Sequence, residues 1–460
     1  MSIVRYDRYE FKRFQSSDRS FLSEAGGALP RQLSRFFASV SCFKTRNEVG
    51  FGAKPRFKKE LVLKKYNMKN IQDYSSVYKD GLLNNIIPFW TKHCVDTEDG
   101  GFTFCLNQDG SLIDTDKGVW QTGRFTWMLG TLYNEVEPRE EWLKLAKHGL
   151  DFLDKHCYDT DGKMFFIVDK KGKPVRKRRY VFSESFAAIA YAAYYKATGE
   201  QEYADKARKA FDTFYKFGTT PGLIEPKFTE HREMRGMGVP MIGMVTAQEL
   251  RKNLGDDSYT QYIDTWIDEI KTYFINEEYQ AVMETVGPNG ELLDHFDGRT
   301  LNPGHAIEGA WFVLQEAKYR DNDADLVALG TKMLDWMWEI GWDKEHGGIL
   351  YFRDVKGLPV QEYWHDMKFW WPHNESIIAT LMAYELTGDE KYKKWHDMVH
   401  EWTFKHFPDE EHGEWFGYLH RDGRISVPLK GNIWKGPFHI PRMYLMAWKT
   451  CESILNKDNV

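Results

Sequence analysis

The feature that most constrains this chain is an internal repeat with a period of about sixty residues. Six segments share one pattern, in which a turn rich in acidic residues or glycine precedes alternating apolar residues. They begin at Asp96, Asp159, Thr219, Glu277, Asp343 and Asp409, so successive copies lie 63, 60, 58, 66 and 66 residues apart. Each copy is typical of a β-hairpin or an extended loop. The chain therefore repeats one structural unit six times.

Each interval between these segments contains two helical patterns. In residues 186–217 a strongly apolar helix ends at Thr198-Gly199, where glycine is a common C-cap. An amphipathic helix follows, with Tyr203, Ala207 and Phe211 on one face. Residues 377–407 repeat this design. Six such pairs predict an all-α fold, an (α/α)6 barrel or toroid with apolar inner helices, amphipathic outer helices and short β-hairpin connections. An open solenoid is the alternative, but six units are few for an open array.

The barrel should occupy residues 68–460, because residues 1–67 contribute no repeat unit. This N-terminal part holds 15 Lys and Arg against 6 Asp and Glu, a net charge of +9, whereas the remainder carries −15. It is predicted to be a weakly structured extension. Two interpretations stay open: a targeting arm, or a start assigned upstream of Met68.

Composition narrows the function classes. The acidic body of the chain gives no support to nucleic-acid binding. The chain also contains no run of about 18 apolar residues, which is the length needed to span a membrane. The five cysteines lie far apart and form no CxxC pair. They argue for a reducing compartment, hence a cytoplasmic location, and against a thiolate metal site.

Polar residues recur in phase with the repeat, where each predicted inner helix begins. They are Arg124, Glu184, the segment from His231, His305 with Glu308, His373 with Glu375, and His439 with Arg442. Trp120, Trp371 and Trp434 lie beside them in the sequence. Any one of these residues could be a helix cap or a buried hydrogen-bonding group. Their common phase predicts one shared pocket at the barrel mouth, where helix N-termini favour anions.

The motifs absent from the chain limit the chemistry of this pocket. No GxxxxGK[ST], GxGxxG or GxSxG occurs, so phosphoryl transfer, dinucleotide binding and elbow-type serine hydrolysis lack support. His305 and Glu308 could ligate a metal, but neither HExxH nor a cysteine partner supports this. What remains is acid–base chemistry by histidines. Two histidines from different helices can remove a proton on one face of a carbon and return it on the other.

Two other classes stay open. Glycoside hydrolases and lyases also use this barrel, and Glu308 with Glu375 could supply the two carboxylates they need. A protein-binding role without catalysis would require a large exposed apolar patch instead.

Four motifs closely resemble the N-acylglucosamine 2-epimerase family in order and spacing, over residues 70–452. They are WQTGRFTWM (Trp120–Met128), NPGHAIEGAWFVL (Asn302–Leu314), KFWWPHNESI (Lys368–Ile377) and GPFHIPRMY (Gly436–Tyr444). Cellobiose 2-epimerases and mannose isomerases share the fold and parts of these motifs. The cellobiose branch tends towards His-Asn-x-Arg in the last motif. The sequence from His439 to Arg442 departs from that, and the pair of segments NPGHAIE and FHIPR looks most like the N-acetylglucosamine branch.

The resemblance implies an (α/α)6 barrel, often a homodimer, that interconverts N-acetyl-D-glucosamine and N-acetyl-D-mannosamine, a step in sialic-acid metabolism. It implies ring opening, and then deprotonation and reprotonation at C2 by His305 and His439. Arg124 would hold the C1 oxygen, and Glu308 and Glu375 would assist ring opening and orient the histidines. The predicted substrate-binding residues are Trp120, Glu184, Asn302, Trp371 and His373. No metal or catalytic cofactor is expected, and ATP is a possible allosteric activator.

Overall fold

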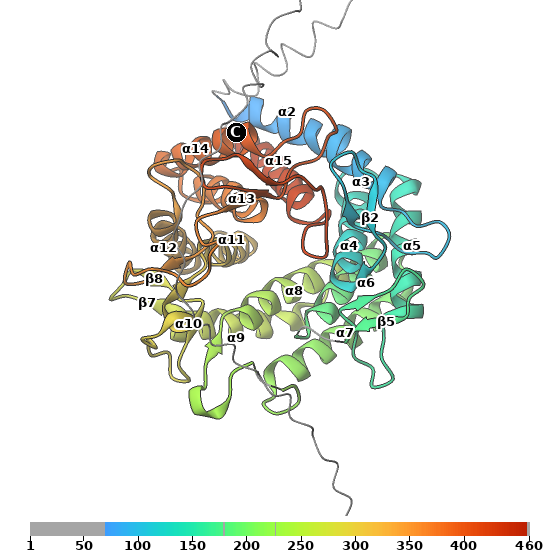
Figure 1. Ribbon diagram of the computed structural model, residues 1–460, viewed down its shortest axis with the longest axis horizontal. Coiled ribbons are helices and arrows are strands. Elements are labelled where there is room, and N and C mark those ends of the chain that lie inside the picture. Colours follow the sequence, from blue (N-terminus) through green and yellow to red (C-terminus); the bar gives the residue numbers. More distant parts are fainter. Residues whose placement is uncertain (1–69, 178–179, 226, 458–460) are drawn as a thin grey trace, which may run out of the picture. The chain divides into compact units, whose positions relative to one another are not determined.

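The computed structural model describes residues 70–177, 180–225 and 227–457, and these residues confirm the predicted helical barrel. Six helices form the inner ring: α4 (Val119–Glu135), α6 (Phe182–Thr198), α8 (Gly238–Leu254), α11 (Pro303–Tyr319), α13 (Trp370–Thr387) and α15 (His439–Lys457). Figure 1 shows them arranged about a common centre, with the other long helices outside them. The predicted extension, residues 1–67, lies outside the described residues.

The outer ring is completed by the first helices of the described chain. Its members are α2 (Ile71–Gly81) with α3 (Ile87–His93), α5 (Glu140–His156), α7 (Gln201–Thr219), α9 (Thr260–Glu269), α12 (Ala324–Gly341) and α14 (Glu390–His406). Helix α2 packs against α15, so the first and last helices meet and close the ring. Within the described ranges, no helix is long and apolar enough to cross a membrane.

The apolar and amphipathic patterns correspond to burial. In α6 every residue from Ser183 to Tyr194 is buried, whereas α7 buries a single stripe that includes Tyr203 and Phe211. Gly199 and Gly388 end α6 and α13 with φ values of 73° and 67°, a left-handed conformation that costs glycine little. These two ends were predicted from the Thr-Gly links.

Short strands form hairpins within a repeat, and some of them also pair with a strand of the neighbouring repeat. A strand that leads into an inner helix pairs antiparallel with a strand of the next repeat. The pairs are β3 (Lys117–Gly118) with β4 (Ile167–Val168), β6 (Arg235–Gly236) with β9 (Thr285–Val286), β10 (Thr300–Leu301) with β11 (Arg353–Asp354), and β12 (Lys368–Phe369) with β13 (Tyr418–Leu419). The hairpins add β5 (Pro174–Arg176), β14 (Ile425–Val427), β1 (Cys105–Leu106) with β2 (Leu112–Asp114), and β7 (Ile275–Asn276) with β8 (Ala281–Val282). The copy from Thr219 differs, since its described residues 219–225 and 227–228 contain no strand.

Buried ion pairs fix these loops at the end of the barrel where the inner helices begin. In three copies the first aspartate accepts hydrogen bonds from the backbone of its own turn and binds a buried lysine. The Nζ–carboxylate distances are 2.8 Å for Lys117 with Asp96, 3.0 Å for Lys368 with Asp343, and 2.7 Å for Lys430 with Asp409. Each lysine also donates to a glycine carbonyl of the same turn. The aspartate of the repeat is therefore a structural residue that holds the barrel mouth in shape.

Candidate active site

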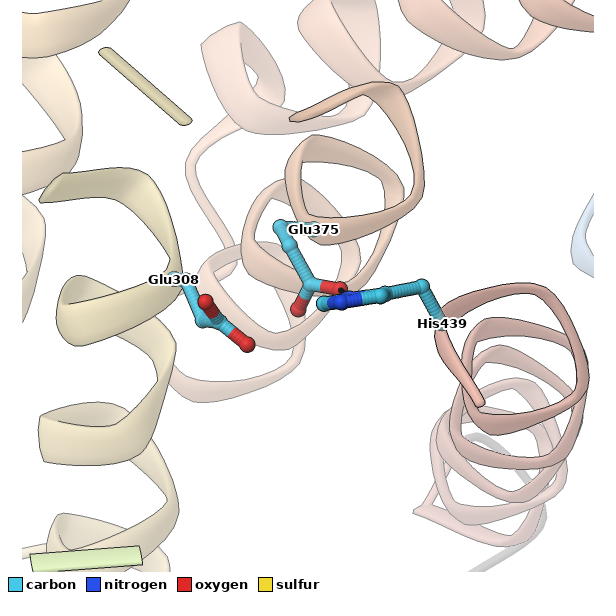
Figure 2. Close-up of side chains that lie close together, drawn as sticks. All are labelled: Glu308, Glu375 and His439. Carbon is cyan, nitrogen blue, oxygen red and sulfur yellow. Dashed lines mark hydrogen bonds and ion pairs between the residues drawn. The ribbon is translucent and has the colours of Figure 1, made fainter. Parts of the chain in front are cut away.

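Three inner helices bring polar side chains together at their N-terminal ends. Glu308 comes from α11, Glu375 from α13 and His439 from the first residue of α15 (Figure 2). One carboxylate oxygen of each glutamate and one ring nitrogen of the histidine lie within 4.8 Å of one another. The sequence therefore predicted correctly that these three residues meet.

Glu375 orients His439. Its Oε1 lies 2.7 Å from Nδ1 of His439, and its Oε2 accepts a hydrogen bond of 2.8 Å from the indole of Trp311. Glu375 is fully buried, and burial raises the pKa of its carboxyl although Arg442 opposes that rise. A neutral His439 that donates its Nδ1–H to Glu375 keeps the Nε2 lone pair available as a base. Burial and the nearby Arg442 lower the pKa of His439 well below its usual value, which favours this neutral form.

Arg442 joins the two carboxylates. Its Nη2 lies 2.8 Å from Oε1 of Glu375 and also forms a short ion pair with Glu308. The guanidinium stacks over Phe438, 4.5 Å from the ring centre. Arg442 recurs in phase with the repeat, but the predicted catalytic set does not include it. The signal was present, because it lies three residues after His439 and so on the same helix face.

His305 contacts a carboxylate that the sequence analysis missed. Its Nδ1 lies 3.0 Å and 3.1 Å from the two carboxylate oxygens of Glu284, which belongs to the segment between β8 and β9. Desolvation lowers the pKa of His305, but the charge and hydrogen bond of Glu284, together with the charges of Glu308 and Glu375, raise it by more, so the net shift is upward. The only signal for Glu284 was a charged residue inside the apolar run AVMETV.

Trp371 lies close to both histidines. Its ring centre is 4.9 Å from that of His305 and 5.9 Å from that of His439. A flat apolar surface therefore adjoins the two candidate acid–base groups, as the sugar-binding prediction for Trp371 requires.

Arg124 is a cation held by aromatic rings. Its guanidinium lies 4.1 Å from the ring centre of Phe186, 4.6 Å from Phe438 and 5.7 Å from Trp120. Among the described residues, none forms a hydrogen bond or ion pair with it. Burial lowers its pKa to about 9, although Glu308 opposes that shift. A cation without a carboxylate partner can stabilise negative charge that develops on a ligand.

Three predicted substrate-binding residues make structural contacts. Glu184 accepts the backbone N–H of Met164 (2.8 Å), and Nε2 of His373 accepts that of Ile349 (2.9 Å), so each anchors a hairpin. His373 also donates its Nδ1–H to the carbonyl of Phe369 at 2.6 Å, which leaves neither ring nitrogen for a sugar. Burial lowers its pKa to about 3, so the ring is neutral.

The third of these residues, Asn302, caps α11. Its side-chain oxygen accepts the backbone N–H of His305 at 3.1 Å, which fixes the start of the helix that carries His305 and Glu308. The segment from His231 begins in an exposed turn, so His231 itself does not join the central group.

The Glu308, Glu375 and His439 group also has the composition of a metal site. In this structure the Arg442 guanidinium binds both carboxylates, so their charge is balanced by a side chain. The arrangement suits acid–base chemistry in which each of the two histidines exchanges a proton with a bound molecule, in a site rich in aromatic rings.

Comparison with known proteins assigns a family to this geometry. The family model for N-acylglucosamine 2-epimerase (GlcNAc 2-epimerase) matches residues 100–440. The N-acylglucosamine 2-epimerase of Bos taurus is 37% identical over 403 residues, which cover 85% of this chain and 94% of that protein. The cellobiose 2-epimerase of Dictyoglomus turgidum is 26% identical over 80% of this chain and 96% of its own.

A solved structure agrees in fold. The cellobiose 2-epimerase of Bacillus thermoamylovorans superimposes with a TM-score of 0.73 at 22% identity, covering 82% of this chain and 99% of that one.

Proposed function

The chain belongs to the N-acylglucosamine 2-epimerase family, and we propose that it interconverts N-acetyl-D-glucosamine and N-acetyl-D-mannosamine. The single observation that carries this proposal is the pair of histidines beside Trp371. His305 and His439 each bind a different carboxylate, and the structure drives their pKa values in opposite directions. Such divergence is typical of sites that use one group as an acid and the other as a base.

The reaction begins with ring opening, because only the open-chain aldehyde makes the C2 proton acidic. Opening breaks the C1–O5 bond, so the anomeric hydroxyl loses a proton and the ring oxygen gains one. Glu308 and Glu375 are assigned to these transfers. Their shared contact with Arg442 holds both carboxylates in place.

The second step exchanges the proton at C2. One histidine takes the proton, and the electron pair of the C–H bond moves into the C1–C2 bond while O1 gains enolate charge. Arg124, a buried cation that contacts aromatic rings, is assigned to bind that charge. The other histidine then donates its proton to the opposite face of C2, and the aldehyde reforms.

A glycoside hydrolase is less well supported. Its two carboxylates must stand about 5–10 Å apart, with the scissile bond between them. Here one oxygen of Glu308 and one of Glu375 lie within 4.8 Å of each other, which is closer than that separation, and Arg442 binds both carboxylates.

The proposal also includes three features implied by the family resemblance: stimulation by ATP without its hydrolysis, a homodimer, and a cytoplasmic role in sialic-acid metabolism. Turnover measured with ATP and with a non-hydrolysable analogue tests the first. Light scattering on the purified protein tests the second.

Proton NMR of N-acetylmannosamine in deuterated buffer tests the reaction itself. N-acetylglucosamine should appear with deuterium at C2. Buried polar groups that bind the acetamide would be left unpaired by sugars that lack it, so cellobiose and mannose should react up to about 10⁴-fold more slowly. Product that retains the original hydrogen at C2, or comparable kcat/KM on cellobiose, would refute the proposal.

A further inference from the structure

Glu284 reaches the site from a rigid loop of the preceding repeat. Its neighbour Thr285 pairs with Gly236 in the β6–β9 ladder, and its own backbone carbonyl accepts the N–H of Met237 at 3.1 Å. These main-chain contacts with Gly236 and Met237 fix the backbone of Glu284, and its two carboxylate oxygens lie 3.0 Å and 3.1 Å from Nδ1 of His305.

The charged groups around the two histidines differ in sign. His305 faces three carboxylates, those of Glu284 from the loop, Glu308 from its own helix and Glu375 from α13.

His439 meets the opposite environment. Its Nδ1 lies 3.3 Å from Nη2 of Arg442, and Arg124 and His305 add further positive charge, while Glu308 opposes them. The carboxylate that His439 binds, Glu375, is itself shared with Arg442.

Solvent access differs as well. The His305 side chain is 35% exposed and Glu284 27%, whereas the corresponding values are 12% for His439 and 0% for Glu375. A proton can therefore reach or leave the site through the His305 and Glu284 pair more readily than through the other.

We propose that Glu284 is a positioning residue that holds His305 as the imidazolium in the free enzyme, so that His305 acts as the acid and His439 as the base for the epimer whose C2 hydrogen faces His439. In the reverse direction the two histidines exchange these roles. This inference rests on the proposed epimerase function. After a turnover His439 carries the proton taken from C2 and His305 has given one away. The cycle is restored when His305 regains a proton from solvent beside Glu284 and His439 loses its own.

The pH dependence of kcat/KM separates this role from a merely structural one. The acidic limb reports protonation of the base, His439, and the alkaline limb reports loss of the proton from His305. Glu284→Gln removes the charge but keeps the shape. Because an adjacent opposite charge is worth about one pKa unit or more, the alkaline limb should move to lower pH by about one unit. The acidic limb should stay where it is. Activity should fall about tenfold at the alkaline end and change little at the acidic end.

Two variants serve as controls. Glu284→Asp keeps the charge and should restore the position of the alkaline limb even where kcat is reduced. Glu277→Gln, in the same connection but 67% exposed and paired with Lys332, should leave the whole profile unchanged.

A measurement on the ligand-free protein removes the dependence on activity. NMR titration of the His305 ring, assigned by comparison with His305→Asn, should show a pKa above 6.5 that falls in Glu284→Gln. An unmoved alkaline limb, a uniform loss of activity at every pH, or an unchanged His305 pKa would overturn the inference. If the wild-type protein shows this coupling but does not epimerise the sugar, the proposed function fails and the role of Glu284 in protonating His305 stands.

Discussion

At the scale of single residues, His305 and His439 are separately supported, by Glu284 and by Glu375. Replacing either histidine should therefore disable one proton transfer without disturbing the other. His305→Asn and His439→Asn should each reduce turnover by at least about 10²-fold, the usual cost of losing a positioned acid or base. Circular dichroism and melting temperature should stay near wild type. Near-full activity in either variant would contradict the two-base mechanism.

Arg442 should contribute more to the stability of the fold than His305 or His439 does. Arg442→Met would leave Glu308 and Glu375 buried without their cation, and breaking a buried pair in this way costs about 3–5 kcal/mol. Burial already raises the pKa of Glu375, so the folded variant should take up protons more readily than the unfolded chain. Its stability deficit should therefore shrink as the pH falls.

Denaturant unfolding at pH 8 and pH 5.5 measures this effect. Arg320→Met is the matched control, because Arg320 is 29% exposed and its loss should cost less at both pH values. An equal deficit for Arg442→Met at both pH values would show that the lost packing over Phe438, rather than the charge, is responsible.

Helical spacing explains which site residues the sequence could identify. Successive residues on a helix turn by about 100°, so side chains three apart share a face and side chains two apart do not. His305 with Glu308, and His439 with Arg442, satisfy the first condition. His373 lies two residues from Glu375 and instead anchors the hairpin at Ile349. The repeat places all of these residues at the start of an inner helix. Whether a side chain belongs to the central polar group or anchors a hairpin depends only on the direction in which it points from that helix.

At the scale of elements, the repeat predicted the helix pairs and their C-caps because these depend on local periodicity. It did not predict that strands such as β3 and β4 join neighbouring repeats, since pairs of two-residue strands leave almost no pattern. Glu284 was missed for the same reason. Its partner, His305, lies 21 residues later in another element, and the contact exists only once the loops have paired.

The contact between α2 and α14 predicts how the stability of the protein changes at low pH. Tyr78 bonds to His400 at 2.7 Å and to His396 at 3.1 Å, and all three side chains are buried. Burial lowers the pKa of His396 to about 4 and that of His400 well below its usual value. Below pH 6.5 the unfolded chain binds protons that the folded protein excludes, so stability falls until the pH reaches the folded pKa. His396 alone should cost on the order of 3 kcal/mol over this range.

Melting temperatures at pH 7 and pH 4.5 test this contribution. His396→Gln cannot take up a proton in this range, so it should lose less between the two pH values than wild type does. His346→Gln, at an exposed position, should show the wild-type loss. If the melting temperature of His396→Gln falls between pH 7 and pH 4.5 by as much as that of the wild type, His396 does not cause the loss of stability in acid.

At the scale of the whole molecule, the barrel is closed by its first described helix. Tyr74 and Tyr78 of α2 are buried, and Tyr74 donates to Asp397 of α14 at 2.6 Å. Without α2, the apolar face of α15 and the His396 and His400 pair would be exposed to water. Ring closure therefore depends on residues from both ends of the described chain.

The position at which the chain begins should therefore determine the stability of the barrel. Residues 1–67 contribute no repeat unit, so a chain that begins at Met68 should fold, melt within a few degrees of the full chain and turn over at the same rate. A chain that begins at Leu82 lacks Tyr74 and Tyr78, and each buried aromatic side chain it loses should cost about 3–5 kcal/mol. It should melt many degrees lower or fail to accumulate in folded form. Differential scanning calorimetry of the three chains decides the matter. A large loss already at Met68 would mean that the basic segment stabilises the barrel, and a Leu82 chain as stable as the full one would mean that α2 does not close it.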